Sequence, residues 1–252
     1  MKYSLIASVI GFCFITVSGC LSAQKPIINQ PEAIKPSVVL ESRLAQDCPI
    51  EMVHVSGKYC SQLEERVCIK KNIDKKLCLE FSSKPIKCFG AEKEVDFCID
   101  KEEFTSVVGD LIPIHNITYT QAENMCADVG KRMCMDFEWT LACEGPEHLP
   151  FAQGYAKGKV CNVGVSIFKL VVNRKLIDFT APINEYPECL SPYGVHNMSG
   201  NSDEWVKKSW GNKPNRSTLK GGYFGGSRNM CRPFSIHNEF YSDVQTSFRC
   251  CK

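Results

Sequence analysis

The feature that most constrains this chain is its cysteine content, because 16 of its 252 residues are cysteine. The chain is too long to be a disulfide mini-protein, so this content is typical of a protein that folds in an oxidising compartment. The sequence holds no Cys-x-x-Cys pair and no Cys/His cluster with zinc spacing. A metal–thiolate site therefore has little support, and we expect most of the cysteines to form structural disulfides.

The N-terminus predicts export. Lys2 precedes an apolar run from Leu5 to Val17, which has the length of a signal-peptide core and is too short to span a bilayer permanently. The run ends in Val17-Ser18-Gly19-Cys20, which resembles a bacterial lipobox, in which the cysteine thiol is acylated. A plain signal peptide that happens to hold a cysteine is the alternative. The lipobox interpretation makes residues 1–19 a lipoprotein signal peptide and Cys20 a lipid anchor.

Residues 20–47 are expected to form an acylated, extended tether. Proline recurs among polar residues at Pro26, Pro31 and Pro36, a composition that favours extended backbone. Leu21 stands where an acidic retention signal would lie, so we expect a lipid-anchored protein of the bacterial cell envelope, at the outer membrane. The partner that this segment predicts is thus the membrane, reached through the lipid.

The cysteine count agrees with this processing. Loss of Cys13 with the signal peptide and acylation of Cys20 leave 16 − 2 = 14 cysteines, an even number that permits seven disulfides. The sequence does not determine their connectivity, although pairing within the N-terminal cluster is one possibility. The expected disulfide cysteines are Cys48, Cys60, Cys68, Cys78, Cys88, Cys98, Cys126, Cys134, Cys143, Cys161, Cys189, Cys231, Cys250 and Cys251.

Residues 48–252 predict one α+β domain that is rich in disulfides and low in regular secondary structure. Short strands are expected at 53–60 and 96–100, separated by a Cys-rich insertion at about 61–91. A capping box at Thr120 and Glu123 predicts a helix with an apolar stripe that ends near Gly130. A second helix is expected from Asp136 to Gly145. The remaining hundred or so residues are rich in Gly, Pro and Asn and predict loops and brief strands.

A series of short motifs runs through the domain in a fixed order. They are Gly130-Lys131-Arg132-Met133, Glu138-Trp139, Ala142-Cys143-Glu144-Gly145, Thr180-Ala181-Pro182-Ile183, Tyr193-Gly194-Val195, Asn197-Met198-Ser199-Gly200-Asn201, Glu204-Trp205-Val206, Lys220-Gly221-Gly222-Tyr223, Cys231-Arg232 and Ser247-Phe248-Arg249-Cys250. In these motifs and their order the chain resembles the formylglycine-generating enzyme (sulfatase-modifying factor) family. The resemblance implies that family's variant of the C-type lectin fold, often with bound calcium.

Calcium is the cofactor that this resemblance predicts. Asn197, Gly200, Ser202 and Glu204 match the family's calcium loop and offer two side-chain oxygens and two backbone oxygens, the mixture that calcium takes. The alternative is that Asn197 and Glu204 satisfy backbone amides in a tight loop. The family's other calcium site carries over poorly, because Lys175 stands where an acidic ligand is expected.

The catalytic positions of the family are altered. Formylglycine-generating enzymes hold copper(I) between two cysteines, and here Gly226 stands at the first position and Cys231 at the second. Tyr223 replaces the expected active-site serine. Because one thiolate does not make the same site, copper is not expected and Cys231 is expected in a disulfide. We assign no catalytic residue.

Aromatic and basic side chains in the C-terminal third are the remaining candidates for function. Trp210, Tyr223, Arg228 and Arg232 suit a surface that binds a protein, peptide or glycan, whereas packing in the core is the alternative for such aromatics. A formal net charge of +2 excludes the broad basic surface of a non-specific nucleic-acid binder. We therefore predict a non-catalytic binding or structural module. The alternatives are a metal-dependent oxidoreductase with a rebuilt site, or an envelope protein that binds another protein of the same cell.

Overall fold

The computed structural model describes residues 48–252 with the exception of 74–75, 107–108, 166–170, 174 and 226–227. These residues belong to one compact unit, residues 43–252. The predicted signal peptide, the anchor Cys20 and the tether lie outside the described residues, as does Gly226. None of the helices in the described part of the chain has the length and apolar character needed to cross a bilayer.

The described residues form two helices and twelve strands, most of them short, as the sequence predicted for an α+β domain of low regular structure. Their bounds are β1 Met52–Cys60, β2 Cys68–Asn72, β3 Leu77–Phe81, β4 Glu92–Asp100, α2 Tyr119–Asp128, β5 Arg132–Met133, α3 Asp136–Glu144, β6 Val171–Val172, β7 Lys175–Leu176, β8 Asp203–Lys207, β9 Ser217–Lys220, β10 Phe234–Ser235, β11 Thr246–Phe248 and β12 Cys250–Cys251.

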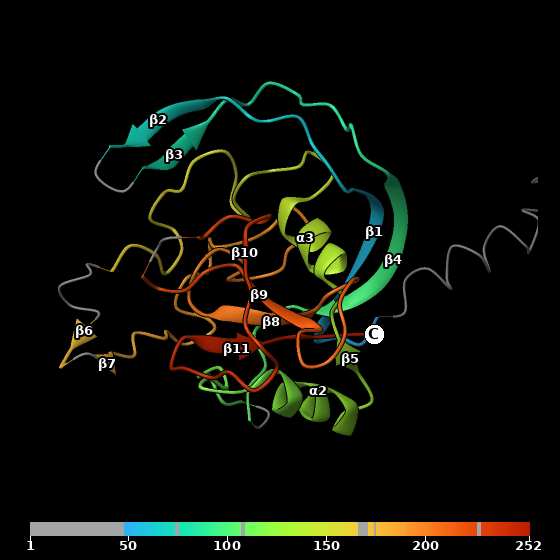
Figure 1. Ribbon diagram of the computed structural model, residues 1–252, viewed down its shortest axis with the longest axis vertical. Coiled ribbons are helices and arrows are strands. Elements are labelled where there is room, and N and C mark those ends of the chain that lie inside the picture. Colours follow the sequence, from blue (N-terminus) through green and yellow to red (C-terminus); the bar gives the residue numbers. More distant parts are fainter. Residues whose placement is uncertain (1–47, 74–75, 107–108, 166–170, 174, 226–227) are drawn as a thin grey trace, which may run out of the picture. The chain divides into compact units, whose positions relative to one another are not determined.

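The first sheet has the order β1-β4-β12-β5. β1 and β4 pair antiparallel along their whole length and curve together in Figure 1. Val95, Phe97 and Ile99 of β4 are buried and alternate along the strand, so the twofold period places them on the core face. β4 begins four residues earlier than predicted, because its pairing with β1 extends through the charged residues from Glu92 onward.

The second sheet has the order β10-β9-β8-β11. β8 and β9 are antiparallel, whereas β11 runs parallel to β8 with Phe248 opposite Trp205. Every residue of β9 and β11 is buried. Neither strand therefore shows the alternation of apolar and polar residues that is typical of a strand with one face in water. This sheet carries the residues on which the candidate site depends.

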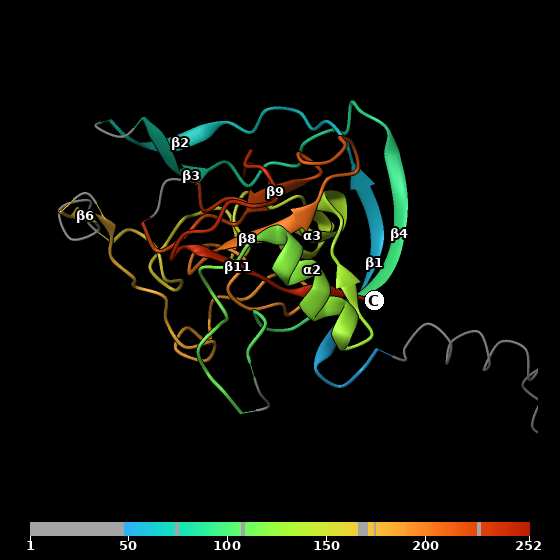
Figure 2. The same ribbon diagram turned by 60° about the horizontal axis from the view of Figure 1, so that its bottom comes forward.

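Helix α3 was predicted with its correct bounds. Gly145 ends it with φ 63°, the left-handed conformation that favours glycine. All but the first of its residues are buried, and in Figures 1 and 2 it lies beside β1 and β8. Helix α2 lies next to β5 in both views.

The N-terminus of α2 differs from the prediction. The capping box is formed by Thr118 and Gln121 and not by Thr120 and Glu123. A start at Thr118 brings Tyr119 onto the buried face of the helix together with Ala122 and Cys126. The predicted end holds, since Gly130 has φ 69° just after the helix.

The Cys-rich insertion forms the hairpin β2–β3, with a disulfide between Cys68 and Cys78. A second disulfide, Cys60–Cys88, closes its base. Arg66 fastens it to the rest of the domain, because its guanidinium donates to carbonyls within the insertion and to those of Glu147 and His148.

Seven disulfides pair all fourteen cysteines of the described residues. The six cysteines of the N-terminal cluster pair among themselves, which was one of the possibilities left open by the sequence. The pairs are Cys48–Cys98, Cys60–Cys88, Cys68–Cys78, Cys126–Cys250, Cys134–Cys251, Cys143–Cys231 and Cys161–Cys189.

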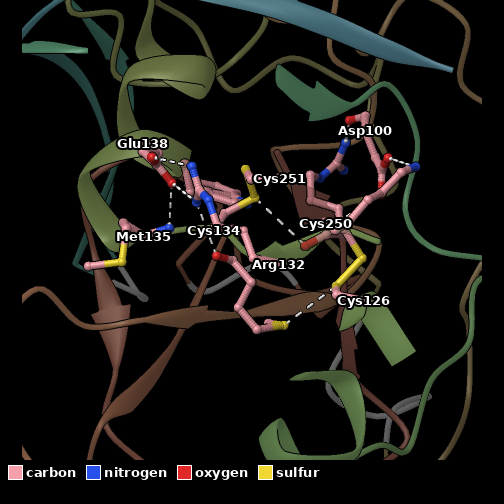
Figure 3. The surroundings of a disulfide bond; sticks show 12 residues. Asp100, Cys126, Arg132, Cys134, Met135, Glu138, Cys250 and Cys251 are labelled. Atoms are coloured by element: carbon pink, nitrogen blue, oxygen red, sulfur yellow. Dashed lines mark hydrogen bonds and ion pairs between the residues drawn. A yellow bond between two sulfur atoms is a disulfide. The ribbon is translucent and has the colours of Figure 1, made fainter. Parts of the chain in front are cut away.

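Two of these disulfides meet at the C-terminal strand. Figure 3 shows Cys250 bonded to Cys126 of α2, while its neighbour Cys251 is bonded to Cys134, which follows β5. The Cys250 amide also donates to the Asp100 carboxylate of β4 at 2.9 Å. β12 is thereby fixed to α2, to the residue that follows β5 and to the end of β4.

Candidate functional site

The loop that leads into β8 holds the residues expected to bind calcium. Asn197, Gly200 and Asn201 have φ values of 58°, 99° and 60°. A Cβ added at Gly200 would lie 2.4 Å from the Asn162 carbonyl oxygen, so this position requires glycine. The loop directs Ser202 and the following strand into the protein interior, where both are buried.

In that interior, Glu204 is bound by protein groups. Its two carboxylate oxygens accept from Nε and Nη2 of Arg249, each at 2.7 Å, and from Nε1 of Trp139 at 2.7 Å. Arg249 is fully buried and also donates to three backbone carbonyls. The ion pair therefore joins β8 to segments before β5 and after β11.

Glu103 is a second carboxylate of this interior. It accepts from Asn201 Nδ2 at 2.8 Å and from the Ser202 hydroxyl at 2.6 Å. Burial, reinforced by the negative charge of Glu204, raises the pKa of Glu103 to about 7, although the positive charge of Arg249 acts in the opposite direction. The hydrogen bonds that Glu103 accepts therefore come from other side chains of the protein.

The two side-chain oxygens expected to bind calcium differ in their availability. The Glu204 carboxylate already faces a guanidinium, whose positive charge would repel a cation. Asn197 Oδ1 is buried with no hydrogen-bond partner among the described residues, so this oxygen is free. The backbone oxygens of Gly200 and Ser202 complete the expected set, and calcium at this loop stays a prediction.

The side chains near the family's second calcium position contact other protein groups. Asp178 forms an ion pair with His115 at 2.9 Å, Asn162 donates to Asn201, and Lys175 lies in β7. The described residues hold no cluster of three or more His, Cys, Asp or Glu side chains suited to a metal ion.

A cavity of about 270 Å³ adjoins α3 and β9. Two exposed aromatic side chains form its rim: Trp210 and Phe234 meet edge to face with ring centroids 6.5 Å apart. The floor is polar and buried, with Thr140, Thr218 and Lys220. The full lining consists of Tyr59, Ser61, Asp136, Thr140, Trp210, Thr218, Lys220, Arg232 and Phe234.

Arg232 is held rigidly in the cavity wall. Its Nε and Nη2 atoms donate to the two oxygens of the fully buried Glu144 at 2.6 and 2.7 Å. Nη2 also donates to the Cys60 carbonyl at 2.9 Å, and the guanidinium lies 5.5 Å from the centre of the Tyr59 ring. The charge of Arg232 is therefore neutralised within the protein.

Lys220 lies on the cavity floor and, unlike Arg232, has no carboxylate partner among the described residues. It is 3% exposed and stands opposite Glu204 of β8 and Phe234 of β10. Its Nζ donates to the Arg232 carbonyl at 3.2 Å and forms no ion pair with any described carboxylate. Burial lowers the pKa of Lys220 to about 8, although the negative charges of Asp136 and Glu144 act in the opposite direction.

The structure brings together two of the four residues predicted for a ligand surface. Trp210 and Arg232 both line the cavity. Arg228 instead pairs with the buried Asp203 at 2.9 Å, and Tyr223 packs edge-on against the buried Phe224. These contacts leave Arg228 and Tyr223 outside the lining of this cavity, and their role in ligand binding stays a prediction.

The comparisons with known proteins now place the chain. The model of the sulfatase-modifying factor enzyme 1-like domain matches residues 89–252, well over half of the sequence. The chain belongs to this family. The match confirms the family inferred from the motifs, and the insertion lies almost entirely before the matched residues.

Solved structures agree on the fold of this sulfatase-modifying-factor domain. CarF is 14% identical over 81% of this chain and 98% of its own, with a TM-score of 0.58. PvdO from Pseudomonas aeruginosa is 17% identical over 82% of this chain and 95% of its own, with a TM-score of 0.53. At these identities the likeness shows the fold alone. No curated protein sequence matches the chain.

Cys231, at the second catalytic position of the family, is a disulfide cysteine in this member. It is bonded to Cys143 of α3 and is fully buried. Its backbone amide donates to the Pro150 carbonyl at 3.0 Å. A sulfur in this bond is not a thiolate, so it offers copper(I) no ligand of the family kind.

Sequence reasoning missed Tyr59, Asp136 and Lys220 as cavity residues. Asp136 was recognised only as the start of a helix. Lys220 was recognised only as part of the Lys220-Gly221-Gly222-Tyr223 motif, and its burial was not expected because a lysine is rarely buried without a partner. Tyr59 gave no signal, because it reaches the cavity from a distant strand.

Proposed function

We propose that this sulfatase-modifying-factor domain is a non-catalytic binding module that is displayed on the bacterial cell envelope by an acyl anchor at Cys20. Its ligand lies in the cavity between Trp210, Phe234 and Lys220. The observation that carries the proposal is this cavity, in which two exposed aromatic rings stand over a buried polar floor. Sites with an apolar wall and a few convergent polar groups are typical of ligand binding.

The position of Cys231 supports a role without catalysis. Oxidation of a substrate cysteine by the family's chemistry requires two free thiolates at one metal ion, and the Cys143–Cys231 disulfide removes one of them. No contact among the described residues favours a rebuilt oxidoreductase site over a binding site, since the polar groups of the interior are bonded to one another.

The size of the cavity limits what it can hold. A volume of about 270 Å³ is at the lower end of small-molecule sites and suits one amino-acid residue or one sugar ring. A ring or apolar side chain would stack on Trp210 and Phe234, while the floor would receive polar groups. The ligand is thus a terminal or protruding group of a peptide or a glycan.

The test uses the full chain purified in detergent without reductant. A panel of N-acetyl amino acids and monosaccharides would be screened by saturation-transfer NMR. For any probe that binds, we expect Trp210→Ala to weaken binding about tenfold or more, because it removes an aromatic anchor.

Phe240→Ala is the matched control, since Phe240 is a similarly exposed aromatic of the same third of the chain that does not line the cavity. Its affinity should equal that of the unaltered chain. Equal affinity of the Trp210→Ala variant, or binding to none of the probes, would contradict the proposed site.

A further inference from the structure

The cations that reach the interior of this domain differ in how their charge is balanced. Arg249 pairs with Glu204, Arg232 with Glu144, and Arg228 with Asp203, each at 2.9 Å or less. A buried charge is costly unless an opposite charge or hydrogen bonds replace its hydration. These three pairs follow that rule, although Arg228 and Arg232 are only partly buried. Lys220 is almost fully buried and has no such pair.

Lys220 keeps two of its three N–H donors unused by the described residues. The single acceptor within hydrogen-bond distance of Nζ is the Arg232 carbonyl at 3.2 Å. The ring of Trp139 lies beneath it, with Nζ 5.4 Å from the ring centroid. Because the side chain lines the cavity, an acceptor that enters this space comes close to the unused donors.

The neighbouring acidic groups are not free to serve as that acceptor. Asp136 lines the same cavity, but its Oδ1 accepts from the amides of Phe137 and Ser209 and its Oδ2 from the Ser209 hydroxyl. Glu144 is fully engaged by Arg232 and contacts His148 at 3.0 Å. The Lys220 ammonium at the cavity floor therefore has no described carboxylate within ion-pair distance, although the Asp136 carboxylate of the same lining carries a negative charge.

A second lysine lies close to the rim of the cavity. Lys208 is also buried, and its Nζ lies 4.3 Å from the centre of the Trp210 ring. Lys208 does not line the cavity itself, but its positive charge lies beside the rim residue Trp210. An anionic group at the rim is attracted by this charge.

We propose that the cavity binds a ligand that carries a carboxylate, and that the Lys220 ammonium receives this carboxylate through charge-assisted hydrogen bonds. The inference rests on the proposed function, because it names the chemistry of the group that the same cavity holds. The carboxylate lies at the floor, and the ring or apolar part of the ligand packs against Trp210 and Phe234. The C-terminus of a peptide and an acidic sugar both supply this chemistry.

The experiment compares acids with neutral partners of the same shape. Benzoate and benzamide are the minimal pair, N-acetylphenylalanine and its amide represent a peptide terminus, and glucuronate and glucose represent a sugar. Each is titrated into the full chain and followed by NMR. We expect at least one acid to bind about tenfold or more tightly than its neutral partner. The pair that shows this difference identifies the source of the carboxylate.

Lys220→Met removes the charge but keeps the length of the side chain, and we expect it to erase the preference for the acid. Lys220→Gln is the second variant, and thermal unfolding checks that both are folded. Lys207→Met is the matched control, because Lys207 is exposed on β8 and does not line the cavity. It should keep the preference.

Three outcomes would overturn the inference. These are equal binding of an acid and its neutral partner, an unchanged preference in the Lys220→Met variant, and a failure of every acid to bind at concentrations up to about 100 mM, far weaker than any specific site. If benzamide binds as well as benzoate and Trp210→Ala weakens both, the carboxylate is refuted while the proposed binding site stands.

Discussion

Glu103 is a buried carboxylate that shares its surroundings with a second one, Glu204, and with a single guanidinium, Arg249. The pKa of Glu103 is raised from its ordinary value of 4.5 to about 7 by burial and by the charge of Glu204. The folded protein therefore holds this proton at pH values where the unfolded chain has lost it. Stability linked to Glu103 is fully present below about pH 4.5 and declines as the pH rises to about 7.

We expect Glu103→Gln to remove this decline. The free energy of unfolding, measured with urea between pH 4.5 and 8, should fall by a few kcal/mol in the unaltered chain and stay nearly level in the variant. Glu94→Gln is the control, because Glu94 is exposed on β4 and should leave the profile unchanged. A profile that declines equally in the Glu103→Gln variant would show that another group is responsible.

Residue-level prediction succeeded where a residue's role depends on its immediate neighbours. Gly130 and Gly145 were placed correctly at helix ends because a left-handed cap is a local requirement. Glu204 was assigned to calcium from its local motif. In the structure its carboxylate accepts hydrogen bonds from Arg249, which lies 45 residues away in the sequence. No local pattern distinguishes a carboxylate that binds a cation from one that binds a distant guanidinium.

Among the elements, α3 was predictable and the start of α2 was ambiguous. Thr118 with Gln121 and Thr120 with Glu123 both match the capping-box pattern. Tertiary contacts decide between them. Glu123 is needed outside the cap, where it pairs with Arg216 at 2.7 Å. Strands of two or three residues, such as β11 and β12, were expected only as a class, since their pairing partners are far away in the sequence.

Disulfides that join distant elements should contribute more to stability than those within one hairpin. Cys126–Cys250 spans 124 residues and is fully buried, whereas Cys68–Cys78 spans 10 and lies in the hairpin β2–β3. In the chain-entropy model a longer closed loop restricts the unfolded chain more strongly. We expect replacement of Cys126 and Cys250 by alanine to cost about 2–5 kcal/mol in the free energy of unfolding.

The matched control is the replacement of Cys68 and Cys78 by alanine. It should lower the free energy of unfolding clearly less, because it opens one hairpin and keeps α2 bonded to β12. Both variants would be unfolded by heat and by denaturant without reductant. Equal losses in the two variants would contradict the view that the links between α2, β5 and β12 hold the domain together.

At the scale of the whole molecule, the cysteines fall into two groups, those of the described domain and those of the N-terminal segment. The seven disulfides use fourteen of them, all between Cys48 and the C-terminus. Cys13 and Cys20 remain, and both lie in the N-terminal segment outside the described residues. This division agrees with the proposed anchor, because all fourteen cysteines of the described residues pair among themselves and none of them is bonded to Cys20.

The anchor predicts that Cys20→Ala releases the protein from the membrane. Acyl chains carry a protein into a detergent phase because each buried methylene stabilises the membrane-bound state by about 0.8 kcal/mol. We expect the unaltered full chain to partition into the Triton X-114 phase and to incorporate radiolabelled palmitate when it is expressed in a bacterium. The Cys20→Ala variant should do neither. Cys13→Ala, which alters the cysteine within the predicted signal peptide, should behave like the unaltered chain. Palmitate in the Cys20→Ala variant, or its loss in Cys13→Ala, would show that the lipid is attached elsewhere or that this segment is an ordinary signal peptide.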